Sequence, residues 1–297
     1  MKTPKRIEPL IEDGMVDEVL RPLMSGKEAA VYVVRCGRQL RCAKVYKEAD
    51  KRSFRQAAEY QEGRKVRNSR QARAMAKGSK YGRKEAEEAW QNAEVAALFR
   101  LASAGVRVPK PYDFLDGVLL MELVTDEDGQ AAPRLNDVHL EAEQAREYHA
   151  FIIRQIVLML CAGLVHGDLS EFNVLLGPDG PVIIDLPQAV DAAANNHALS
   201  MLERDVANMA HYFGRFAPEL KQTRYAREMW ALYQEGKLLP DSVLTGAWQD
   251  DEHAADVGGV LREIEAAKFE DARRRAGREE AERGPVKGEE PPPPWAQ

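Results

Sequence analysis

The sequence has few cysteines and no long apolar run. Its three cysteines, Cys36, Cys42 and Cys161, form no CxxC pair, which argues against a zinc site, although the spacing leaves a disulfide between the first two open. The longest apolar stretch, residues 152–165, contains Arg154 and Gln155 and is too short to span a bilayer. The N-terminus lacks the apolar core of a signal peptide. We therefore expect a cytoplasmic protein with reduced thiols and no membrane partner.

The sequence also lacks an even distribution of charge. The chain has 297 residues, 30% of them charged, and a net charge of −6. Residues 47–84, which we call the basic segment, hold 13 Lys and Arg against 4 Asp and Glu, so this segment carries +9 and the remainder −15. Such a segment is either a solvated insertion or a surface for RNA, a ribosomal particle or an acidic partner.

The periodicity of apolar residues changes along the chain. In the first half, alternating and β-branched residues predict strands at residues 18–24, 30–34, 39–46, 112–115 and 118–124. One helix is expected before the last two strands, at residues 90–104, because its apolar residues share one face and Gly105 follows it. Beyond residue 135, the pattern predicts helices at 141–163 and 200–213 on either side of a short hairpin, 174–176 and 182–184.

These elements predict an α+β protein with two lobes. Residues 17–124 form an N-lobe with an antiparallel sheet, one helix and the basic segment. Residues 125–250 form a reduced, mostly helical C-lobe. The remaining parts are an N-terminal extension, residues 1–16, and a charged, Pro-rich C-terminal tail, residues 251–297.

The string His-Gly-Asp-Leu-Ser-Glu-Phe-Asn at residues 166–173 is the most specific chemical signal. It follows the long predicted helix, and Asn173 stands five residues after Asp168. This is the spacing of a kinase catalytic loop, in which the Asp accepts or orients the substrate hydroxyl proton and the Asn binds Mg²⁺. We expect Asp168 to be catalytic and Asn173 to be a metal ligand.

A second carboxylate, Asp185, follows the apolar residues Val182, Ile183 and Ile184. Asn173 begins one strand of the predicted hairpin and Asp185 ends the other, so antiparallel pairing brings both to the same end. Two oxygen ligands, phosphate oxygens and waters satisfy Mg²⁺ or Mn²⁺. We therefore expect Asp185 to be both a catalytic residue and a metal ligand. The alternative is that Asp185 only caps a turn.

Two N-lobe signals are typical of nucleotide binding. Lys44 lies among apolar residues of the third strand and fits a phosphate-contacting lysine, with Glu94 on the predicted helix as its acidic partner. Glu87 and Glu88 are weaker candidates for that partner. Between the first two strands, Ser25, Gly26 and Lys27 provide hydroxyl, backbone and ammonium donors for phosphate oxygens, although neither a glycine-rich kinase loop nor a Walker A motif is present.

Together these segments resemble the RIO family of atypical serine kinases. The matching strings are SGKEAAVY (25–32), CAKVYK (42–47), AGVRVPKPYDFLDGVLLMELV (104–124), HGDLSEFN (166–173), IIDLPQAV (183–190) and LERDVANMAHYF (202–213). Gly167 and Phe172 replace the Ala and Tyr that are frequent in the family's catalytic loop. Few residues precede the first strand, so the resemblance is to the compact branch without an N-terminal winged helix, which a bacterial member would fit.

The resemblance implies a bilobal protein-kinase-like fold with ATP between the lobes and no activation loop. It implies an adenine site formed by Ala43, Met121, Glu122 and Val124, with the Glu122 C=O and Val124 N–H as hinge groups. It also implies that Asp205 braces the catalytic loop, although an ordinary helix salt bridge is the alternative. In the family the segment between Lys44 and Glu94 is often autophosphorylated.

The preferred hypothesis is an ATP- and Mg²⁺-dependent serine/threonine protein kinase that phosphorylates an unknown protein substrate and itself. One alternative is an assembly factor that hydrolyses ATP on a ribonucleoprotein, through a transient phosphate on Asp185. Another is a small-molecule kinase of the aminoglycoside or choline type, which also uses HGDxxxxN. The GKEAxVY and IDLPQ strings argue against this second alternative.

Overall fold

The computed structural model describes residues 3–26, 29–47 and 80–248, with only the backbone described for residues 80–90. The chain divides into two units, Met1–Trp248 and Gln249–Gln297, and every described residue belongs to the first. The tail predicted at 251–297, the central part of the basic segment and Lys27 lie outside the described residues.

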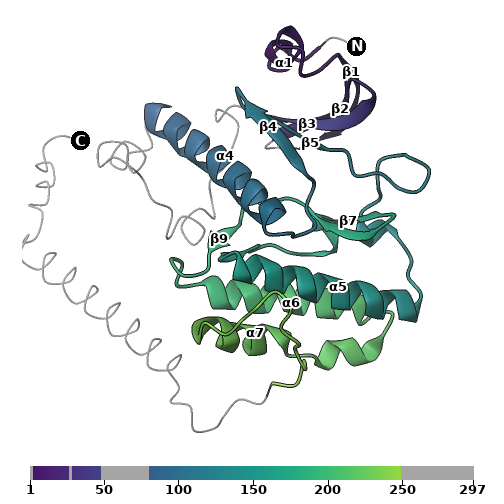
Figure 1. The fold of residues 1–297 in the computed structure, drawn as a ribbon, viewed down its shortest axis with the longest axis vertical. Coiled ribbons are helices and arrows are strands. Elements are labelled where there is room, and N and C mark those ends of the chain that lie inside the picture. Colours follow the sequence, from purple (N-terminus) through teal and green to yellow (C-terminus); the bar gives the residue numbers. More distant parts are fainter. Residues whose placement is uncertain (1–2, 27–28, 48–79, 249–297) are drawn as a thin grey trace, which may run out of the picture. The chain divides into compact units, whose positions relative to one another are not determined.

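The N-terminal half forms an antiparallel five-stranded sheet in the order β1-β2-β3-β5-β4 (Figure 1). Its strands are β1 Glu18–Ser25, β2 Ala29–Cys36, β3 Gln39–Tyr46, β4 Pro111–Leu115 and β5 Val118–Glu122. The predicted α+β class is confirmed. The last strand ends at Glu122 rather than at the predicted Val124, because the chain there leaves β3 for a loop in which the Val124 C=O accepts a hydrogen bond from Ala132 N–H at 3.0 Å.

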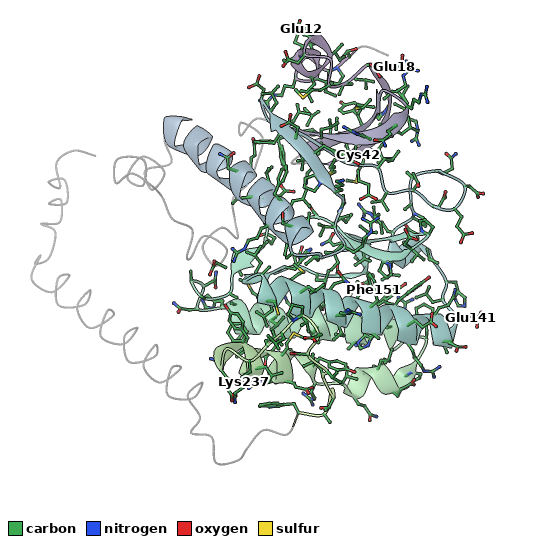
Figure 2. All side chains as sticks on the ribbon, viewed as in Figure 1. Glu12, Glu18, Cys42, Glu141, Phe151 and Lys237 are labelled. Carbon is green, nitrogen blue, oxygen red and sulfur yellow. The ribbon has the colours of Figure 1, made fainter. Side chains whose placement is uncertain are left out.

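The two faces of this sheet have different partners, because successive side chains on a strand point to opposite sides. On one face, Ala43 and Val45 pack with Ile7 and Leu10 around α1, Glu8–Glu12. The segment predicted as an extension thus contributes to the sheet's core. On the other face, Cys42 packs with neighbouring apolar residues, namely Val31, Val33, Met121 and Leu123; Figure 2 labels Cys42 on this sheet.

One long helix, α4 Lys80–Ser103, precedes β4. It begins ten residues before the predicted helix. The prediction started too late because apolar residues at helical spacing appear only from about Trp90 onward. Val95, Leu98 and Leu101 are buried in the main core, and Glu94 is buried on the same helix at 5% exposure. A buried carboxylate on an otherwise apolar face requires a cationic partner.

The C-terminal half is mostly helical, with α5 Ala142–Cys161, α6 Ala198–Phe213 and α7 Tyr225–Gln234. The hairpin β7 Val174–Gly177 and β8 Gly180–Ile183 and the pair β6 Leu164–Val165 and β9 Val190–Asp191 complete it, with short 3₁₀ turns η2 Leu135–Asp137, η3 Glu171–Asn173 and η4 Pro218–Gln222. The predicted helices and hairpin are confirmed, whereas α7 and the β6–β9 pair were not predicted. None of the described helices combines the length and hydropathy needed to cross a membrane.

Arg107, in the connection from α4 to β4, links the sheet to the helical half. Its backbone N–H donates to Gln155 Oε1 on α5 at 2.7 Å, and its C=O accepts from Ile183 N–H at 2.9 Å. Its guanidinium makes two hydrogen bonds to the Glu122 carboxylate, at 2.9 and 2.8 Å. Burial alone would raise the pKa of Glu122, but these bonds and the Lys110 N–H lower it below its ordinary value.

Candidate active site

The catalytic-loop candidate Asp168 lies between β6 and η3, where the backbone belongs to no helix or strand. Its carboxylate side chain belongs to an exposed residue, whereas the flanking Gly167 and Leu169 are buried. The Gly167 φ of 81° lies in the left-handed region, which favours glycine. The loop therefore turns sharply at Gly167 and presents Asp168 to solvent.

Asp205 on α6 binds the backbone of this loop through its carboxylate. Its two carboxylate oxygens accept hydrogen bonds from Gly167 N–H at 2.8 Å and from Leu169 N–H at 2.9 Å, one on each side of Asp168. Burial raises the pKa of Asp205, and His166, the two backbone N–H groups and Arg204 oppose that rise. The geometry favours the bracing role over an ordinary helix salt bridge.

His166 and Asn173 bind the loop from within the chain. His166 Nε2 lies 3.1 Å from the Ile184 C=O, which can only accept a hydrogen bond, so the ring hydrogen is on Nε2. His166 Nδ1 then accepts a hydrogen bond from Asp168 N–H at 3.3 Å. Asn173 Nδ2 donates to the Asp168 C=O at 2.8 Å. The loop is thereby tied to Ile184, directly before Asp185.

Asn173 and Asp185 lie at the same end of the β7–β8 hairpin. Val174 pairs with Ile183, and Ile184 N–H donates to the Asn173 C=O at 2.9 Å. Asp185 has a φ of 66°, a left-handed conformation that is uncommon outside glycine and carries a strain of order 1 kcal/mol or more. Its side chain is 49% exposed. The residue after the hairpin is therefore turned out of the strand direction.

Lys44 joins the sheet to this hairpin end. Its Nζ lies 2.5 Å from Glu94 Oε1 and 3.7 Å from Asp185 Oδ1. The Lys44 and Glu94 side chains are only 15% and 5% exposed, so their charges are largely removed from water. The structure brings together the predicted lysine, its predicted acidic partner and the predicted metal-ligating carboxylate.

A RIO domain model matches residues 30–226 of this sequence, more than half of the chain. That range contains Lys44, Glu94, Asp168, Asn173 and Asp185. The chain belongs to the RIO domain family. The family predicted from the sequence is therefore confirmed.

Several curated relatives carry kinase names. The RIO-type serine/threonine-protein kinase Rio1 of Haloferax volcanii is 38% identical over 212 residues, which is 69% of this chain and 67% of the relative. Its namesake in Methanocaldococcus jannaschii is 34% identical over 210 residues, 69% of this chain and 66% of the relative. Human serine/threonine-protein kinase RIO1 is 31% identical over 217 residues, 72% of this chain but only 36% of the human protein.

The phosphate-loop candidates of this RIO domain lie at the end of β1. Ser25 is the last residue of that strand, and Gly26 N–H donates to the Ala29 C=O at 2.9 Å. Lys47 lies in the basic segment and in the CAKVYK string but was not predicted as part of the nucleotide site; it donates to the Gly26 C=O at 2.6 Å and to Ser25 Oγ at 3.2 Å. The available signal was its position directly after Tyr46, the predicted end of β3.

The structure separates the adenine-site candidates. Ala43 packs on the α1 face of the sheet, with Val45, so its side chain points away from the side that carries Lys44. Cys42 lies two residues before Lys44 on β3 and therefore faces the same side of the sheet; it pairs with Met121 and is 4% exposed. Alternation along the strand was the signal that would have favoured Cys42 over Ala43.

The hinge candidates follow β5. The Glu122 side chain is engaged by Arg107, and its N–H donates to the Lys110 C=O at 2.8 Å. Val124 is buried, and no backbone acceptor for its N–H is found within the described part of the chain. Of these two residues, the groups suited to hydrogen-bond an adenine edge are therefore the backbone C=O of Glu122 and the backbone N–H of Val124.

The donor set at Asn173 and Asp185 fits an oxygen-ligated divalent cation that is only partly enclosed by protein. Among the described residues, no three His, Cys, Asp or Glu side chains are grouped to hold a metal by themselves. An amide and a carboxylate at one hairpin end suit Mg²⁺, which keeps several waters and binds through few protein ligands together with phosphates. The residues present therefore match the predicted ion in kind.

Proposed function

We propose that this RIO domain is a serine/threonine protein kinase, which transfers the γ-phosphoryl group of ATP to a hydroxyl of a protein. The names of the relatives support the activity. The observation that carries it for this chain is the convergence of Lys44, Glu94 and Asp185 from three separate elements, at 2.5 and 3.7 Å. A surface lysine would have no reason to be buried against a carboxylate.

Asp168 is the group that receives the acceptor's proton. The acceptor hydroxyl oxygen forms a bond to the γ-phosphorus while the bond from that phosphorus to the β,γ-bridging oxygen breaks, and the hydroxyl proton passes to the Asp168 carboxylate. Asn173 donates its Nδ2 hydrogen to the Asp168 C=O, which leaves its Oδ1 for a cation. Mg²⁺, when held by Asn173 and Asp185, neutralises charge on the phosphate oxygens.

The nucleotide site extends from Lys44 along the sheet. Lys44 contacts the α- and β-phosphates, and Ser25, Gly26 and Lys27 cover the phosphates. Cys42, Met121 and Val124 form the adenine site, with Cys42 taking the place first given to Ala43, because Cys42 shares the face of Lys44.

The decisive experiment incubates the purified chain with γ-labelled ATP and Mg²⁺ and follows both protein-bound label and free phosphate. Label transferred to the chain or to an added basic protein, with little free phosphate, supports the kinase. Stoichiometric phosphate release without label on any hydroxyl would instead support an ATPase, and label on a small aminoglycoside or choline would contradict a protein kinase.

We further propose that the basic segment carries autophosphorylation sites and docks RNA in the cytoplasm. Its +9 charge and the hydroxyls of Ser53, Ser69 and Ser79 support this proposal. It is tethered between Lys44 and Glu94, and tethering raises the effective concentration of its hydroxyls at the site. Mass spectrometry after incubation with Mg·ATP should find phosphate on one of these serines. Salt-insensitive RNA binding, or none at low salt, would contradict the docking role.

A further inference from the structure

Two side chains of α6, Arg204 and Asn208, bind the catalytic loop from the carbonyl side. Asn208 Nδ2 donates to the Leu169 C=O at 3.0 Å, and Arg204 Nη2 donates to the Gly167 C=O. The two residues are four apart on the helix and flank Asp205, so one face of α6 carries all three. The carbonyl contacts complement the N–H contacts that Asp205 makes to the same two residues.

The three residues centred on Asp168 have all six of their backbone polar groups bound by side chains. The N–H groups go to Asp205, His166 and again Asp205, and the C=O groups go to Arg204, Asn173 and Asn208. A helix or strand would supply such partners from the backbone. Here the conformation of the loop depends on side chains, four of these contacts coming from α6.

We propose that Asn208 is a positioning residue for Asp168, which rests on the proposed kinase function. Its amide fixes the peptide unit between Leu169 and Ser170, one unit beyond the peptide unit that Asp168 shares with Leu169. Without that donor, this peptide unit can rotate about the chain, and Asp168 loses a defined direction toward the acceptor hydroxyl. Arg204 fixes the preceding peptide unit in the same way, but its side chain belongs to an exposed residue with further contacts, so Asn208 is the cleaner target.

The role predicts a specific kinetic signature. Asn208 makes no described contact with Lys44, Glu94, Asn173 or Asp185, so ATP and metal binding do not depend on it. Its effect falls on the alignment of the acceptor hydroxyl, where a displacement of about 1 Å can cost on the order of 100-fold in rate. A residue that merely stabilises the fold would instead lower thermal stability and all kinetic constants together.

The test compares wild-type full-length chain with Asn208→Leu, Asn208→Ala, Asp168→Ala and His211→Ala, measuring kcat, the KM for ATP and the melting temperature. Leucine keeps the size of asparagine without its donor. His211 is an exposed residue of the same helix with no contact to the loop among the described residues, so its variant is the matched control. We expect a fall in kcat of about 10- to 100-fold for both Asn208 variants. The KM for ATP and the melting temperature should remain near wild type, and His211→Ala should be unchanged.

Three outcomes separate the possibilities. If Asn208→Leu retains kcat within about twofold of wild type, the positioning role is wrong while the kinase assignment stands. If Asn208→Leu and Asn208→Ala lose kcat, ATP affinity and melting temperature together, the residue is structural and the inference is likewise overturned. If wild type itself transfers no phosphate, or Asp168→Ala is as active as wild type, the proposed function fails first.

Discussion

Lys44 Nζ lies 3.7 Å from Asp185 Oδ1, although one residue belongs to β3 of the sheet and the other follows β8 of the helical half. The same ammonium lies 2.5 Å from Glu94 Oε1 on α4. The Lys44 ammonium, which lies between the carboxylates of Glu94 and Asp185, therefore links the sheet to the helical half. Anionic phosphates bound there would compete with Asp185 for the Lys44 ammonium. A divalent metal bound to Asp185 would reduce this competition by neutralising its carboxylate.

The buried pair of Lys44 and Glu94 predicts a difference between stability and activity. Lys44→Met leaves the Glu94 carboxylate buried without its cation and should lower the free energy of unfolding by about 3 kcal/mol. Adding Glu94→Gln should restore much of that loss but none of the phosphoryl transfer, which is expected to fall about 100-fold or more. Denaturant unfolding and initial rates are measured for wild type, Lys44→Met, Glu94→Gln and the double variant, which together complete the cycle. Equal stability of Lys44→Met and wild type would contradict the buried pair.

The hairpin end at Asn173 and Asp185 predicts a metal-dependent response to nucleotide. ATP should raise the melting temperature of wild type more with Mg²⁺ or Mn²⁺ than with excess chelator, because ligand that binds only the native state stabilises it. Asp185→Asn should abolish the metal-dependent part of this shift. Thermal unfolding with and without metal measures it. A shift of equal size in chelator, or one unchanged by Asp185→Asn, would exclude these residues as metal ligands.

His149 on α5 predicts a loss of stability in mildly acidic solution. Its ring is 2% exposed, lies 5.8 Å from Phe213 and 5.9 Å from Tyr225, and its Nε2 has no partner among the described residues. Burial lowers the pKa of His149 to about 4 from an ordinary 6.5. The unfolded state therefore takes up a proton between these values, and stability present above about pH 6.5 falls as the pH drops toward 4.

The size of this effect should be about 3 kcal/mol across the whole window. His149→Phe, which needs no proton and fills an aromatic site, should flatten the pH dependence of the free energy of unfolding. The matched control is His211→Ala, an exposed histidine on α6. Parallel curves for wild type and His149→Phe between pH 6.5 and 4 would show that another group is responsible.

The contact between Arg107 and Glu122, at the end of β5, is expected to depend on the shape of the guanidinium as well as on its charge. Its two hydrogen bonds to Glu122 require the planar fork of a guanidinium. Arg107→Lys should therefore weaken the fold nearly as much as Arg107→Met, by about 1–2 kcal/mol in denaturant unfolding. The two side chains are 32% and 27% exposed, which keeps the effect modest. Full retention of stability by the lysine variant would reduce the contact to a simple charge pair.

The sequence was sufficient for features with strong local patterns. Alternation predicted the strands, and the spacing of Asp168 and Asn173, together with the hairpin argument, predicted which groups meet at Asp185. The Lys44–Glu94 contact was also predicted, because a phosphate-contacting lysine needs an acidic partner and Glu94 lies where the apolar face of the next helix begins. In these cases the residues that meet are fixed by strand pairing or by helix period.

Contacts between distant segments with weak local signals were missed. The helix α1 has only five residues, too few for a reliable period, and is stabilised by packing Ile7 and Leu10 on the sheet. The clamp formed by Arg204 and Asn208 looks in sequence like two ordinary polar residues of a surface helix. Only the fold shows that their face of α6 lies beneath the catalytic loop.

In the proposed mechanism, Asp168 receives the acceptor proton during phosphoryl transfer. The most direct test is single-turnover transfer from γ-labelled Mg·ATP by wild type and Asp168→Asn, with the ATP-induced melting shift measured in parallel. We predict that Asp168→Asn keeps the melting shift but transfers label about 100-fold more slowly or less. Transfer at the wild-type rate by a folded Asp168→Asn that binds ATP normally would exclude Asp168 as the group that receives this proton.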